Sequence, residues 1–146
     1  MGRIIAIDYG KKRTGLAVTD PLRIIASPLE TVSTGELENW LRNYIEKEDV
    51  EEIVIGYPVT LNNEPSDAVK YIEPFIIRIN KLYPGLPVIK IDERFTSKMA
   101  FRTMIDGGVK KKDRRDKGMV DRISASILLQ TYLEKKAFLN DKETKK

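Results

Sequence analysis

The first third of the chain consists of short apolar runs separated by turn-rich stretches, a pattern typical of β-strands. These runs predict three strands, over residues 3–8, 14–20 and 25–32. Because the strands follow one another so closely, we expect an antiparallel meander. Ser33 and Glu36 have the spacing of a capping box, and the apolar residues that follow them keep to one stripe. This segment predicts a helix that ends near residue 49.

The rest of the chain alternates between strand and helix patterns. The run Ile53-Val54-Ile55-Gly56 suits a strand buried on both faces, whereas apolar residues farther along have helical spacing. The predicted elements are, in order, a strand over 51–58, a helix over 65–83, a strand over 88–93, a helix over 97–105 and a long helix from about 119 to 138.

This order of elements predicts an α/β fold, in which three antiparallel strands and then parallel βα units form a mixed five-stranded sheet flanked by helices. Right-handed crossovers place the later strands beside the first strand, which becomes central. A chain of 146 residues suits one domain. We assign residues 1–138 to that domain and residues 139–146 to a polar C-terminal tail.

The composition restricts the available chemistry. The chain has no Cys and no His, which excludes disulfides, zinc sites built on these ligands and Ser–His–Asp triads. Any catalysis must therefore use carboxylates, hydroxyls, Lys, Arg or Tyr. The apolar runs are too short for a signal peptide or a membrane span, so we expect a cytoplasmic protein without a membrane partner.

Charge is unevenly distributed along the chain. Residues 1–93 carry 11 Lys and Arg against 15 Asp and Glu, whereas residues 94–146 carry 15 against 7. A basic C-terminal half favours a polyanionic partner, because cations near phosphates gain Coulomb energy and release counterions. Solubilising surface charge is an equally good explanation of this pattern alone.

Three carboxylates are candidates for a shared site. Asp8 ends the first strand on the face of Ile4 and Ala6, and Glu93 continues the row of Ile89 and Ile91 in the same way, although Asp92 is its immediate neighbour. Asp121 begins a stripe of small residues on the last helix. Each acid also has a structural explanation: a turn Asp, an ion-paired Glu, and an Asp favoured by a helix dipole.

If the three acids meet, they form a site for Mg²⁺ or Mn²⁺, hard cations that prefer oxygen ligands. Such ions stabilise the attacking and leaving oxygens of phosphodiester hydrolysis, which needs no His. Cations that could contact phosphates cluster in three places in the sequence: Lys11, Lys12 and Arg13 at a hairpin, Arg94 beside Glu93, and Lys110, Lys111, Lys112, Arg114 and Arg115 in a charged loop. A solvated linker is the alternative for that loop.

Four motifs in order resemble the YqgF family, also called RuvX. They are the segment from Ile5 to Ala17, then Ile55-Gly56-Tyr57-Pro58, then Asp92-Glu93-Arg94-Phe95-Thr96-Ser97, and Val120-Asp121 with Ser124-Ala125. The resemblance covers residues 3 to about 135. It implies a ribonuclease H-like fold and an acidic site at Asp8, Glu93 and Asp121, with Lys11, Lys12, Arg13 and Arg94 facing the substrate.

Members of this family are described as nucleases that process the 5′ end of pre-16S ribosomal RNA or as Holliday junction resolvases. The resemblance therefore implies a metal-dependent hydrolase whose substrate is precursor rRNA or a four-way DNA junction, and a junction resolvase is expected to act as a homodimer. A non-catalytic nucleic-acid-binding assembly factor is the main alternative. An actin-like or sugar-kinase fold is disfavoured, because those proteins need a second domain to enclose ATP.

Overall fold

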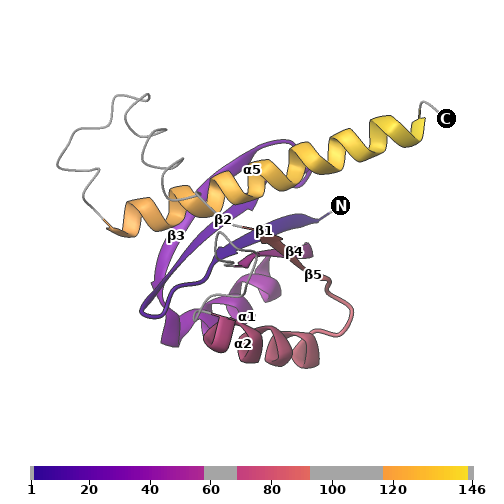
Figure 1. The fold of residues 1–146 in the computed structure, drawn as a ribbon. Helices are drawn as coiled ribbons and strands as arrows, with labels where there is room; N and C mark the ends of the chain where they lie inside the picture. Colours follow the sequence, from indigo (N-terminus) through magenta and orange to yellow (C-terminus); the bar gives the residue numbers. More distant parts are fainter. Residues whose placement is uncertain (1, 58–68, 93–116, 145–146) are drawn as a thin grey trace.

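The computed structural model describes residues 2–57, 69–92 and 117–144. Within these ranges the chain forms an α/β structure in three layers (Figure 1). Its elements are β1 (Arg3–Asp8), β2 (Arg13–Thr19), β3 (Ala26–Ser33), the 3₁₀ turn η1 (Thr34–Glu36), α1 (Leu37–Lys47), β4 (Val50–Tyr57), α2 (Val69–Leu82), β5 (Val88–Asp92) and α5 (Lys117–Thr144).

The five strands form one mixed sheet in the order β3-β2-β1-β4-β5. β1 pairs antiparallel with β2, and β2 pairs antiparallel with β3, as the closely spaced strands predicted. β4 lies parallel to β1, and β5 parallel to β4. The predicted fold class and the central position of the first strand are confirmed, so the carboxyl ends of three parallel strands lie at the same edge of the sheet.

The two faces of the sheet are covered by different helices. α1 and α2 pack on one face and α5 crosses the other (Figure 1). Ile5 and Ile7 of β1 belong to the α1–α2 core, whereas Ile4 and Ala6 belong to the α5 core, as the period of two along a strand requires. Thus β1 is buried on both faces up to Asp8, where the buried part of the strand ends.

Two sequence-based expectations about helix ends are wrong. Ser33 precedes η1 but makes no capping hydrogen bond through its side chain; instead the Thr34 amide donates to the Lys12 carbonyl, which joins this turn to the β1–β2 hairpin. The last helix also continues past Phe138 to Thr144. Residues 139–144 contain no Gly or Pro that would end a helix, so polar composition alone did not mark its end.

Figure 1 shows the C-terminal part of α5 extending past the sheet. No helix in the described part of the chain is both long and apolar enough to cross a membrane.

Candidate active site

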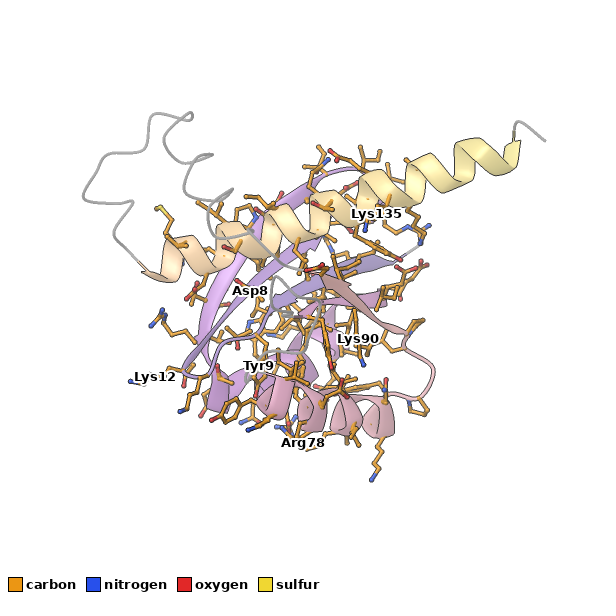
Figure 2. The ribbon with its side chains drawn as sticks, in the orientation of Figure 1. Asp8, Tyr9, Lys12, Arg78, Lys90 and Lys135 are labelled. Atoms are coloured by element: carbon orange, nitrogen blue, oxygen red, sulfur yellow. The ribbon has the colours of Figure 1, made fainter. Side chains whose placement is uncertain are left out.

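Asp8 is the last residue of β1 and is half-buried. Because side chains alternate along a strand, Asp8 shares the face of Ile4 and Ala6, which pack in the α5 core. Tyr9, the next residue, packs against the opposite core. Figure 2 accordingly shows Asp8 toward α5 and Tyr9 toward α1 and α2. The side chains of these two neighbouring residues therefore lie on opposite faces of the sheet.

Gly15 brings the sheet and α5 together beside Asp8. It is the register partner of Asp8, and opposed Cα atoms of an antiparallel pair lie about 5 Å apart. A Cβ atom on Gly15 would lie 2.0 Å from the Asp121 carbonyl oxygen, so only a glycine lets the helix approach this closely. The contact places the backbone of Asp121 next to the end of β1, and a shared site of the Asp8 and Asp121 carboxylates stays a prediction.

The N-terminal part of α5 is held by polar contacts as well as by packing. Arg13 at the start of β2 donates from Nε to Asp121 Oδ2 at 2.8 Å, and both side chains remain partly exposed. On β3, Thr31 donates its hydroxyl to the Gly118 carbonyl and accepts a hydrogen bond from Arg122. These bonds orient the Asp121 carboxylate, because they fix the helix end from which it projects.

The small-residue stripe of α5 lies against the sheet as its spacing predicted. Ser124, Ala125 and Leu128 are 1%, 0% and 3% exposed, and Ala125 and Leu128 pack with Ala6 and Ala17. Small side chains on both surfaces allow the close approach seen at Gly15. The close packing of α5 therefore determines where Asp121 lies.

The third predicted carboxylate, Glu93, lies outside the described residues. What precedes it is described: Ile89 and Ile91 pack in the α5 core, whereas Lys90 contacts Glu73 of α2 on the opposite face. β5 therefore has the alternation of faces on which the prediction of Glu93 rests. By the same alternation Asp92 belongs to the face of Lys90, opposite the face of Asp8.

The donor set suits a hard divalent cation, since carboxylate oxygens are the ligands that Mg²⁺ and Mn²⁺ prefer. Asp8 ends β1, and the backbone of Asp121 packs on Gly15, the register partner of Asp8; Glu93 would be the third ligand. Among the described residues, no group of three Asp, Glu, Cys or His could hold a metal ion. Asp8 and Asp121 are thus two of the three predicted ligands, and the third lies outside the described residues.

The β1–β2 hairpin carries three exposed cations whose contacts point in different directions. Arg13 pairs with Asp121 beside α5, whereas Lys11 Nζ lies 5.4 Å from the centre of the Tyr71 ring on α2. Lys12 lies at the tip of the hairpin (Figure 2). The predicted phosphate-binding residues Arg94, Lys110, Lys111, Lys112, Arg114 and Arg115 lie outside the described residues.

The structure explains why a glycine is needed at position 10, which sequence analysis did not find. In the structure a Cβ atom on Gly10 would lie 2.2 Å from the Arg13 carbonyl oxygen, so the hairpin itself requires glycine. The Gly10 carbonyl also accepts a hydrogen bond from the Thr34 hydroxyl at 2.6 Å. The hairpin is thereby attached to the segment that leads into α1.

A hollow of about 480 Å³ lies on the other face of this hairpin, and sequence analysis did not find it. It is lined by Tyr9 and Lys11 from the hairpin, by Glu38 of α1 and by Phe75 and Arg78 of α2, together with the start of η1. Tyr71, Phe75 and Arg78 are spaced four and three residues apart, so the sequence alone places them on one face of a helix. Only the fold brings Tyr9 and Lys11 beside them.

Comparison with known proteins gives close relatives. A protein from Bacteroides thetaiotaomicron is 57% identical over 138 residues, which cover 94% of this chain and 100% of the relative. One from Flavobacterium johnsoniae is 51% identical, with the same coverage. Both carry the name "Putative pre-16S rRNA nuclease". These relatives match nearly the whole chain, including the segments outside the described residues.

Among solved structures, Thermus thermophilus RuvC in complex with a Holliday junction substrate superimposes with a TM-score of 0.55. The match covers 92% of this chain and 96% of that chain at 16% sequence identity, a level that shows a shared fold. The predicted ribonuclease H-like fold is confirmed.

The family model described as "RuvX: Holliday junction resolvase" matches residues 2–135, almost the entire described fold and the segments between its parts. This match and the relatives above 50% identity confirm the resemblance seen in the sequence motifs. The chain belongs to the RuvX family.

Proposed function

We propose that the protein is a metal-dependent nuclease that processes the 5′ end of precursor 16S rRNA. The observation that supports the proposal is the contact of Gly15 with the Asp121 backbone, which brings the start of α5 beside the end of β1 at Asp8. The names of the relatives supply the substrate. The family description supplies the second candidate, a four-way DNA junction.

In this proposal Asp8, Asp121 and Glu93 hold Mg²⁺ or Mn²⁺, which when bound would activate water and stabilise the leaving oxygen of a phosphodiester. The chain contributes positioning. Arg13, which pairs with Asp121 at 2.8 Å, keeps that carboxylate oriented and places a permanent positive charge where a phosphate would bind. Lys12 at the hairpin tip would contact the substrate backbone without reading its sequence.

The first test compares wild type with Asp8→Asn on a labelled precursor 16S rRNA fragment and on a four-way DNA junction, each with Mg²⁺ or Mn²⁺. We expect cleavage of the RNA by the wild type and a loss of more than about 100-fold in the variant, since even outer-shell partners of a metal contribute about 10–100-fold. Asn keeps the shape of Asp and removes the charge that attracts the cation.

Glu46→Gln is the matched control, because Glu46 is an exposed carboxylate on α1. It should cut at the wild-type rate. If only the junction is cut, the substrate is a four-way DNA junction and not precursor rRNA. Equal binding of either substrate by wild type and Asp8→Asn, without any cleavage, would contradict the nuclease proposal and favour a binding factor.

A further inference from the structure

The hollow between the hairpin and α2 has the size and composition of a ligand site. Its volume of about 480 Å³ falls within the roughly 300–1,000 Å³ of small-molecule pockets. Tyr9 and Phe75 form an aromatic wall, with ring centres 5.1 Å apart. Lys11 and Arg78 add two cations to the same lining. We call this hollow the hairpin pocket.

The aromatic surface of the pocket continues onto the outside of α2. Phe75 is nearly buried, whereas Tyr71, one helical turn before it, is 46% exposed. Lys11 Nζ lies 5.4 Å from the centre of the Tyr71 ring, which puts a cation and an accessible aromatic ring at one margin. Proteins that bind single-stranded nucleic acid combine these two features, cations for the backbone and aromatic rings for the bases.

The charges of the pocket leave donors for an anion. Arg78 donates from Nε to Glu38 Oε1 at 2.5 Å, and this bond uses one of the five N–H donors of a guanidinium. Glu38 therefore orients Arg78 without occupying its whole fork.

We propose that the hairpin pocket binds one unpaired nucleotide of an RNA strand, with the base against Tyr9 and Tyr71 and the phosphate between Lys11 and Arg78. This inference rests on the proposed function, whose substrate it describes in more detail. Asp8 and Tyr9 are adjacent and face opposite sides of the sheet (Figure 2). A strand that crosses the β1–β2 hairpin would therefore reach the acidic site and the hairpin pocket in succession.

The pocket is tested by binding of a fluorescent single-stranded RNA of about 12 nucleotides, measured by anisotropy without added metal. Tyr71→Ala should weaken binding by about 5- to 150-fold, the range for loss of one stacked base. Tyr71→Phe, which keeps the ring, should bind like wild type. Arg78→Gln should weaken binding and reduce its salt dependence, whereas Arg42→Gln, an exposed Arg on α1, should do neither.

A second measurement locates the base. The same RNA carrying one 4-thiouridine is cross-linked by light, and the modified peptide is identified by mass spectrometry. We expect cross-links at Tyr71 or Tyr9. Cross-links confined to other segments would overturn the inference, as would unchanged binding by folded Tyr71→Ala and Arg78→Gln, or a wild type that does not bind the single strand.

These outcomes are separate from those of the proposed function. Metal-dependent cleavage that is lost in Asp8→Asn, together with unaltered RNA binding by both pocket variants, would overturn the pocket and leave the nuclease. Weakened binding by Tyr71→Ala and cross-linking at Tyr71, without cleavage of any substrate, would support the pocket and contradict the nuclease.

Discussion

Gly15 is the position at which a single methyl group would disturb the candidate active site most directly. Its Cβ atom would lie 2.0 Å from the carbonyl oxygen and 2.2 Å from the carbonyl carbon of Asp121, backbone atoms that move only with the helix. We expect Gly15→Ala to lower the free energy of unfolding by about 1–3 kcal/mol, as overpacking does. It should also reduce cleavage, because Asp121 moves away from Asp8. Urea denaturation and the cleavage assay measure the two effects.

Gly85→Ala is the control for this change. A Cβ atom on Gly85 would meet no heavy atom within 4 Å, so the same substitution adds a methyl group without a clash. It should unfold at or slightly above the wild-type urea midpoint. Equal midpoints for the two variants would show that α5 does not depend on the close approach at Gly15.

The element that most determines the site is α5, and a polar contact on β4 anchors its middle. Glu52 accepts hydrogen bonds from the Tyr132 hydroxyl and from Lys136 Nζ, both at 2.7 Å. Burial by itself would raise the pKa of the Glu52 carboxyl, but the bonds from Lys136 and Tyr132 outweigh it and lower the pKa. Ionised Glu52 therefore stabilises the folded protein.

Glu52→Gln should lower the free energy of unfolding by about 1.5–3 kcal/mol at pH 7, the range of a hydrogen bond to a charged group. The folded-state pKa lies below the ordinary value of about 4.3, so the wild-type advantage is complete above that pH. It should decline as the pH falls through the folded-state pKa and be absent below it. Urea denaturation at several pH values measures the difference.

Glu48→Gln is the matched control for this ion pair. Glu48 pairs with Arg3 at 3.3 Å, and its side chain is 44% exposed, against 16% for Glu52. Solvent screens such a pair, so the substitution should change stability by less than about 1 kcal/mol. A difference between wild type and Glu52→Gln that does not change with pH would show that the charge of Glu52 has no part in anchoring α5.

At the scale of the whole molecule, the basic C-terminal half is expected to contribute to nucleic-acid affinity. Replacing Lys110, Lys111 and Lys112 by Ala should weaken binding and flatten its salt dependence. Each lost phosphate contact reduces the slope of log K against log salt concentration by about 0.7 for a single strand or about 0.9 for a duplex. The slope is obtained from the affinity for each of the two test substrates, measured at several salt concentrations between about 50 and 200 mM.

A triple variant of Lys47, Lys81 and Lys135 to Ala is the control. These three lysines are exposed on α1, α2 and α5, and their loss changes the net charge by the same amount. An equal change of slope in both triple variants would attribute the effect to net charge rather than to contacts made by residues 110–112.

Much of the fold was predictable because the strands and helices have different periods. The alternation in β1 assigned Ile4, Ala6 and Asp8 to one face, and the spacing on α5 assigned Ser124, Ala125 and Leu128 to a buried stripe; both assignments are confirmed. Helix ends were less predictable. Ser33 had the spacing of a cap, but Thr34 is bonded to the hairpin instead, a contact between segments far apart in the sequence.

The sequence by itself determined the order of the strands and helices in the described part of the chain, the absence of Cys and His chemistry, the family motifs and the face on which Asp8 lies, because these depend on composition and on local periodicity. Only the tertiary structure decided that Gly15 touches Asp121, that Arg13 pairs with that acid while Lys11 turns toward Tyr71, and that Tyr9 joins Phe75 and Arg78 in a pocket. These contacts join residues separated by long stretches of chain, and they arise from the packing of helices on two faces of one sheet, which no local pattern records.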